Sequence, residues 1–167
     1  MKKFLIIFFL FNSFFFNSSF AVEKIVYLDL DFILANSNKG KLILSNLENL
    51  NKKNIDILKS KESLIKKEEE EIIKQKNIIS IESYNEKINN LKNKIKILRE
   101  EKNKLANNFA ETRKIKINEF FKTIDKVLRE YVENNSIDLV LNKKDILIGK
   151  NNYNITDDIL KIVNELK

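Results

Sequence analysis

The residues of this sequence that could most readily take part in catalysis are four aspartates near its two ends. Asp29 and Asp31 are separated by one residue and follow a short apolar stretch, while Asp157 and Asp158 stand together near the C-terminus. Carboxylates arranged in this way can bind Mg²⁺ beside a substrate phosphate. Whether the two pairs act together depends on the elements that position them.

The spacing of the first pair resembles the strand-then-DxD signature of the haloacid-dehalogenase-like phosphotransferases, and Asp157 and Asp158 could represent that family's later acidic pair. That fold requires a doubly wound sheet of many strands, whereas over half of this chain is predicted to form a coiled coil. The structural interpretation is that Asp29 ends a strand, Asp31 caps a helix, and the later pair occupies the first turn of a helix, where the macrodipole favours acids. The sequence also contains no His and no Cys, which removes the commonest metal ligands and most nucleophile–base pairs. We therefore expect no enzyme, no metal and no cofactor.

Between residues 41 and 133 the sequence contains no proline and no glycine and repeats apolar residues every seven positions. The repeat forms four stripes: Ile81, Ile88, Ile95 and Phe109; Tyr84, Leu91, Leu98 and Leu105; Ile43, Leu50, Ile57, Leu64 and Ile78; and Leu44, Leu58, Ile65, Ile72 and Ile79. A seven-residue period keeps an apolar seam along one side of a helix, and this seam needs a partner helix.

The stripes of the two halves do not share one frame across residues 76–83. Ser83 fits a capping box with the glutamate three residues later, and Ser80 is an alternative N-cap. We therefore predict an antiparallel helical hairpin, with helices over 41–77 and 83–133 and a turn within 76–83. A single unbroken coiled-coil rod is the alternative.

The residues on either side of the hairpin predict short elements contributed by both ends of the chain. These elements are a strand over 24–30, a helix over 32–36, strands over 137–141 and 146–148, and a final amphipathic helix that follows a cap at 156. Asp31 and Thr156 are the expected helix caps. Gly40 is expected to break the chain direction with a positive φ.

We assign residues 22–40 and 134–167 to a small body and residues 41–133 to an inserted arm, which makes the chain α+β and mostly α. A body with about three short strands is marginal alone, and its open strand edges invite pairing. We therefore predict an oligomer whose subunits complete one small β-barrel. The residues expected at this contact are Ile25, Val26, Leu28, Leu139, Val140 and Leu141.

The first 21 residues are typical of a signal peptide. Lys2 and Lys3 precede a mainly apolar run over 4–16, and Ser19 and Ala21 provide small residues where a signal peptidase reads the chain. We predict cleavage after Ala21 and export, with an uncleaved membrane anchor as the alternative.

The net charge is +7, and the basic excess lies on the arm, where residues 41–133 carry 22 Lys and Arg against 16 Asp and Glu. Such a surface either keeps a coiled coil soluble or attracts anionic partners, such as acidic polypeptides and lipid head groups. Nucleic acid is not expected, because the predicted export and the lack of a platform of interleaved aromatic and basic residues argue against it. The candidate contact residues, on charge alone, are Lys92, Lys94, Lys96 and Arg99.

The whole pattern resembles the Skp/OmpH periplasmic chaperones of Gram-negative bacteria. The charged hairpin is one part of the resemblance. The other parts are an opening match at 24–29, 32–34 and 40–41 and a closing match at 137–141, 146–148 and 154–160.

This resemblance implies a homotrimer in which a small intersubunit β-barrel carries three helical hairpins around a cavity. It implies an ATP-independent periplasmic holdase that captures unfolded outer-membrane β-barrel proteins and prevents their aggregation without a cofactor. Some family members also bind lipopolysaccharide through basic residues on the arm. A structural coiled-coil spacer or tether of the cell envelope is the alternative function.

Overall fold

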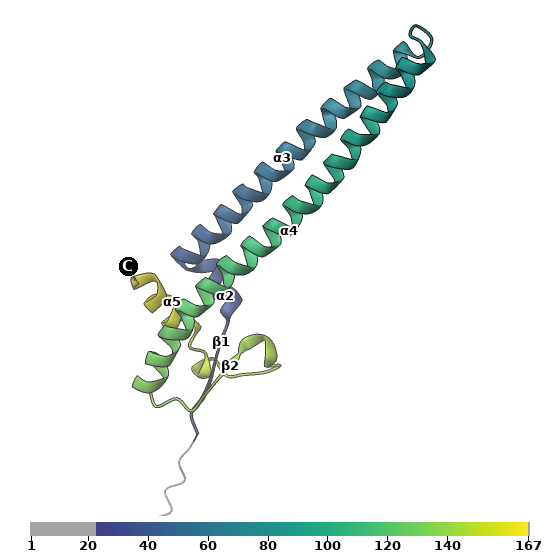
Figure 1. Cartoon of the computed structure of the whole chain (residues 1–167). Helices are drawn as coiled ribbons and strands as arrows, with labels where there is room; N and C mark the ends of the chain where they lie inside the picture. The colour runs from purple at the N-terminus through teal and green to yellow at the C-terminus, as the bar shows by residue number, and fades with distance from the viewer. Residues whose placement is uncertain (1–22, 167) are drawn as a thin grey trace, which may run out of the picture.

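The computed structural model describes residues 23–166, so the predicted signal peptide and its cleavage site lie outside the described residues. The elements, in chain order, are β1 (Ile25–Leu28), α2 (Leu30–Asn36), α3 (Asn38–Gln75), α4 (Ile81–Asn134), β2 (Leu139–Asn142), two 3-10 turns (Lys143–Asp145 and Asn151–Tyr153) and α5 (Thr156–Glu165). α3 and α4 pack side by side as a long hairpin that projects from a small body formed by the other elements (Figure 1). The chain is therefore mostly helical, and it is a hairpin rather than a single rod.

The hairpin turns at residues 76–80. α4 begins at Ile81 with Ser80 as its N-cap, and the Oγ of Ser80 accepts a hydrogen bond from the N–H of Ser83 at 3.2 Å. The alternative cap is therefore the one used. The capping box at Ser83 does not form, because Ser83 already lies within the first turn of the helix.

The junction between α2 and α3 is a single residue, Ser37, which is the C-cap of α2 and the N-cap of α3. Its side chain is fully buried, and its Oγ accepts a hydrogen bond from the N–H of Gly40 at 3.1 Å. The prediction of a positive φ at Gly40 is wrong, since Gly40 is helical and the left-handed position among the described residues is Ser136, with φ 50°. Glycine is needed at position 40 for space: a Cβ atom there would overlap the carbonyl oxygen of Leu34.

Asp29, and not Asp31, is the N-cap of α2. Its Oδ1 accepts a hydrogen bond from the N–H of Phe32 at 2.9 Å. That hydrogen bond is the main cause that lowers the pKa of Asp29. Burial opposes it more weakly, and Lys143, whose Nζ lies 3.2 Å from Oδ2, adds to the lowering. The helix therefore starts earlier than predicted, and Leu30 leaves the strand.

Thr156 does not cap α5 either, because it is the first helical residue. Its hydroxyl accepts a hydrogen bond from the N–H of Asp29 at 2.9 Å, and the side chain of Asn154 accepts one from the N–H of Thr156 at 3.1 Å. Asp157 and Asp158 occupy the first turn of α5, as the structural interpretation of the sequence proposed. The hydrogen bond between Asp29 and Thr156 thus connects the end of β1 to the N-terminus of α5.

The sheet has two strands in the described part of the chain. β1 and β2 pair in parallel, with Ile25 opposite Leu139 and Leu28 opposite Asn142. The predicted strand over 146–148 is wrong, since this segment pairs with no strand in the described residues and Leu147 is 97% exposed. A strand requires a neighbour for its backbone N–H and C=O groups, so residues 23–166 of one chain do not close the expected barrel.

The hydrophobic core lies in the body, and α4 contributes much of it. The buried cluster comprises Val26, Leu28, Ile33, Phe120, Ile124, Val127, Ile137, Ile155, Ile159 and Val163. Three of these residues come from the last third of α4. This part of α4 thus belongs to the body as well as to the arm, which the sequence analysis extends to residue 133. The body consequently has a larger core of its own than that boundary implied.

Candidate functional surfaces on the arm and the body

Three polar contacts connect α3 to α4 along one flank of the arm, and we call them the ladder. Each contact joins the end of a lysine side chain to an acidic or amide oxygen on the facing helix. The pairs are Lys61 with Glu101 at 2.5 Å, Lys94 with Glu68 at 2.6 Å, and Lys87 with Gln75 at 2.6 Å. Members on each helix are spaced by seven residues, and a slip by seven would place Lys61 opposite Lys94 or Glu68 opposite Glu101. The charges of the ladder therefore favour the observed antiparallel register.

Sequence reasoning found only Lys94 among the six ladder residues, and it assigned that residue to partner contact. The available signal was the heptad spacing of polar residues beside the apolar stripes, at 61, 68 and 75 and again at 87, 94 and 101. Polar residues in these flanking positions commonly pair between helices and set orientation. The signal becomes specific only once the register of the hairpin is known.

We expect Lys94→Glu to lower the free energy of unfolding by about 1 kcal/mol, because it places two carboxylates together across the hairpin. Exchanging the charges, with Lys94→Glu and Glu68→Lys in one chain, should restore most of the loss. The same cycle at Lys96 and Glu100, an exposed pair at 4.0 Å within α4, provides the control and should show almost no coupling. Urea unfolding of the variants measures both couplings; equal values would show that the ladder does not specify register.

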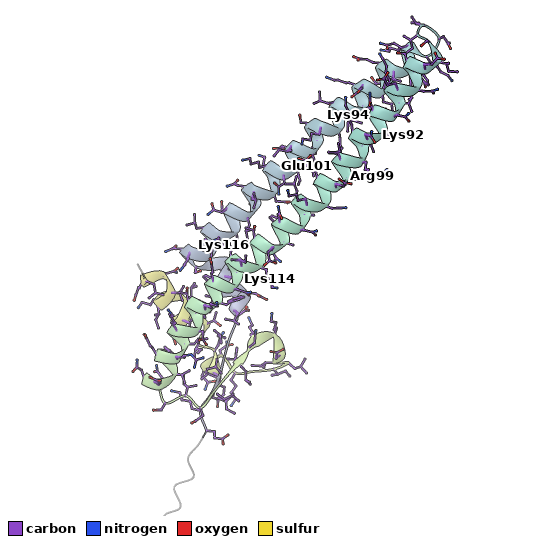
Figure 2. All side chains as sticks on the ribbon, in the orientation of Figure 1. Lys92, Lys94, Arg99, Glu101, Lys114 and Lys116 are labelled. Carbon is purple, nitrogen blue, oxygen red and sulfur yellow. The ribbon has the colours of Figure 1, made fainter. Side chains whose placement is uncertain are left out.

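The four basic residues proposed for partner contact have different surroundings. Lys94 is a ladder member and is engaged with Glu68, whereas Lys92 and Arg99 form no ion pair within residues 23–166. Figure 2 shows Lys94 on the side of α4 that faces α3, and Lys92 and Arg99 on the opposite side. Lys96 is largely exposed and only distantly paired. We call Lys92, Lys96 and Arg99 the basic flank.

The two apolar stripes of α3 also differ. The stripe that contains Ile65 and Ile72 faces α4, and Ile72 is only 4% exposed. The other stripe lies beside the seam on the ladder side, where Leu64 is 63% exposed. Together with Ile97 of α4, which is 61% exposed, Leu64 lines a hollow of about 310 Å³ over the two ion pairs of the ladder.

The six apolar residues proposed for subunit contact also fall into two groups. Val26 and Leu28 are buried in the chain's own core, and Val140 packs partly against it. The exposed group comprises Ile25, Leu139 and Leu141, with exposures of 40%, 47% and 38%. Alternate residues of a strand point to opposite faces of a sheet, so this exposed group forms what we call the outer sheet face.

The outer sheet face continues into the loop after β2, where Leu147 and Ile148 are 97% and 90% exposed. A hollow of about 350 Å³, lined in part by Ile25, Leu141 and Ile148, lies on the same surface. The exposure of residues 147 and 148 could not be predicted from the sequence, because a short apolar run is typical of a buried strand. The apolar surface of the body is therefore formed by the outer sheet face and this loop together.

The four aspartates considered at first are not gathered into a catalytic group. Asp29 caps α2, Asp31 lies near Lys144, with 3.4 Å between the charged atoms, and Asp158 accepts a hydrogen bond from the hydroxyl of Tyr131 at 2.8 Å. Burial and this contact with Asp158 raise the pKa of Tyr131. Over residues 23–166, no three acidic side chains converge in a way that could hold a metal ion, and no helix combines the length and apolar character needed to cross a membrane.

Comparisons with known proteins agree with this architecture. A crystal structure of an OmpH-like protein from Caulobacter crescentus, provisionally described as an outer membrane chaperone, superposes with a TM-score of 0.79 at 11% sequence identity and covers 86% of this chain and 85% of its own. At that identity the likeness shows a shared fold. No curated protein matches the sequence. The family model for OmpH-like outer membrane proteins matches residues 24–163, so this chain belongs to the OmpH-like family.

Proposed function

We propose that this protein is an ATP-independent holdase of the periplasm, which captures unfolded outer-membrane β-barrel proteins and prevents their aggregation. The observation that supports this proposal best is the arm itself: a long hairpin whose flanks remain exposed and which, among residues 23–166, packs on no third element beyond the body. In such a molecule the extended surface is the part available for function. Membership of the OmpH-like family is consistent with this role.

The working form in this proposal is a homotrimer joined through the body. The apolar outer sheet face and the exposed Leu147 and Ile148 support this part, because monomeric proteins rarely leave such continuous apolar surface in water. Three bodies joined in this way would complete the sheet that one chain leaves open. The three arms would then surround a common space in which one unfolded chain can be held by many weak contacts.

In this proposal, neither capture nor release of the client requires ATP. Unfolded β-barrel proteins expose apolar strands that aggregate in water, and contacts distributed over three arms would isolate one such chain without folding it. Release would follow when the client reaches a membrane in which its folded form is more stable. The basic flank is the candidate contact for acidic clients and for lipopolysaccharide or other anionic lipid surfaces.

The second candidate function, a coiled-coil spacer or tether of the envelope, needs rigid arms but no client. Mixing the protein with a urea-diluted outer-membrane β-barrel protein separates the two functions, with light scattering as the measure of aggregation. A holdase should suppress the scattering at near-stoichiometric amounts and without ATP. A spacer would leave the scattering unchanged.

Electrostatic attraction should accelerate capture. We expect the association rate for an acidic unfolded client to fall as salt rises and the Debye length shrinks from ~10 Å to ~3 Å. Reversal of the basic flank, with Lys92, Lys96 and Arg99 changed to Glu, should give the high-salt rate already at low salt. Lys94 is left unchanged in this variant because its reversal would also disturb the ladder. Stopped-flow fluorescence of a labelled client measures the rates.

The matched control reverses Lys114, Lys122 and Lys126, which are exposed cations of α4 near or within the body and form no ion pair in the described part of the chain. It produces the same change in net charge at a different place. Equal slowing by both variants would assign the effect to overall charge. Association rates that change neither with salt nor with charge reversal would indicate that the excess positive charge serves only to keep the protein soluble.

A further inference from the structure

The ladder flank of the arm carries a row of hollows with a common apolar residue. Besides the hollow of about 310 Å³ between Leu64 and Ile97, one of about 460 Å³ extends toward the tip, and one of about 640 Å³ extends along α3 toward the body. Leu64 lines all three. The row follows α3 from residue 49 to residue 75, which corresponds to roughly 40 Å of helix.

The charges around the central hollow are paired. Lys61 is neutralised by Glu101, and Lys94 by Glu68, so the floor between the two exposed apolar residues has no net charge. Lys92 and Arg99 of the basic flank, by contrast, lie on the far side of α4 (Figure 2). Around the central hollow, the arm thus separates an apolar, locally neutral surface from a side with unpaired positive charge, whereas the hollow toward the body also has Lys52 and Lys53 in its lining.

The ladder also offers hydrogen-bonding groups. The paired side chains remain partly exposed, at 46% and 53% for Lys61 and Lys94 and 29% and 31% for Glu101 and Glu68. An ammonium group has three donors and a carboxylate has about four acceptor positions. Each ion-paired side chain can therefore form further hydrogen bonds besides those to its partner. An extended polypeptide has unpaired backbone N–H and C=O groups, and these groups are complementary to such a mixed row.

A third helix fits this flank less well than an extended chain. The backbone groups of a helix already pair with one another, so the polar capacity of the ladder would remain unused against it. A helix would also need an unbroken heptad stripe, and Glu71 interrupts the stripe of Leu64 before Ile78.

From these observations we propose that the ladder flank is the surface that binds apolar, extended segments of an unfolded client, with client side chains in the hollows around Leu64 and Ile97 and client backbone groups on the ladder. This inference rests on the proposed holdase function and deepens it. The basic flank then attracts the client, and the ladder flank retains it.

The test compares two double variants in high salt, where electrostatic attraction is screened. Leu64→Ser with Ile97→Ser removes the apolar residues of the ladder flank. Ile55→Ser with Ile73→Ser is the control, since these isoleucines of α3 are 41% and 59% exposed and line none of the three hollows. Fluorescence titration with a urea-diluted β-barrel protein should show about tenfold weaker binding for the first variant and an unchanged affinity for the control. Circular dichroism melting confirms that both remain folded.

A second measurement locates the client directly. The sequence contains no cysteine, so Leu64→Cys and Ile73→Cys each introduce a single thiol. Bound client should slow alkylation at position 64 and leave position 73 as reactive as before.

The possible results separate the inference from the function on which it rests. Unchanged affinity of the Leu64/Ile97 variant, or equal loss in the control, overturns the ladder flank as the client surface while the holdase function stands. A change of oligomeric state on substitution at 64 and 97 would assign this flank to a contact between copies of the arm. Absence of client binding by the wild-type protein overturns the holdase proposal itself.

Discussion

Leu139→Asp should convert the assembled protein into a folded monomer. Leu139 is 47% exposed in the single chain, so an aspartate there can remain hydrated and the body should still fold. In the proposed trimer the same position would be enclosed between subunits, where an unpaired carboxylate costs several kcal/mol at each contact. That cost exceeds what the association of small interfaces tolerates at micromolar concentrations.

Light scattering coupled to size exclusion measures the mass, and circular dichroism measures the helix content. Leu166→Asp is the matched control, because Leu166 has a similar exposure of 50% and lies at the other end of the body sequence. Val26→Asp should behave differently from both and unfold the body, since Val26 is 3% exposed. A wild-type protein that is already monomeric would refute the proposed assembly. An intact trimer of the Leu139→Asp variant would show that the interface does not include Leu139.

Gly40→Ala should lower the free energy of unfolding by about 3 kcal/mol, although alanine normally stabilises a helix relative to glycine. The added Cβ would overlap the carbonyl oxygen of Leu34 and approach the Oγ of Ser37 at 2.7 Å. Neither atom can yield easily, because one belongs to the backbone of α2 and the other is the buried cap of α3. The junction that sets the direction of the arm would have to open.

Urea unfolding provides the energy for this comparison. Asn46→Ala, at an exposed position of the same helix, should be neutral or slightly stabilising and serves as the control. If Gly40→Ala were equally harmless, the close approach of α2 to α3 would have no energetic importance. Client binding by the variant would further show whether the angle of the arm matters to capture.

The sequence by itself determined the hairpin, because a heptad repeat specifies its structure locally. Residues 41–133 contain no helix breaker, and the two halves carry stripes whose frames disagree at 76–83. A seam of this kind can be covered only by a second helix. The family resemblance was likewise readable at the two ends of the chain, and the OmpH-like model matches across both.

Helix caps were predicted less well, since neighbouring residues compete for the same role. Asp29 and Asp31, or Ser80 and Ser83, are equally good caps by type. The choice between them depends on where the preceding strand or turn ends, and that is fixed by packing. Thr156 illustrates this dependence, because its hydroxyl contacts the backbone of Asp29, 127 residues away in the sequence.

Only the tertiary structure decided which apolar and charged residues are available to partners. Val26 and Ile25 are adjacent and chemically alike, yet one is in the core and the other on the outer sheet face. Lys94 and Lys92 are similar in the sequence, but the register of the hairpin places only Lys94 opposite a glutamate. Burial and pairing depend on contacts between distant segments, and residue type and local spacing do not contain that information.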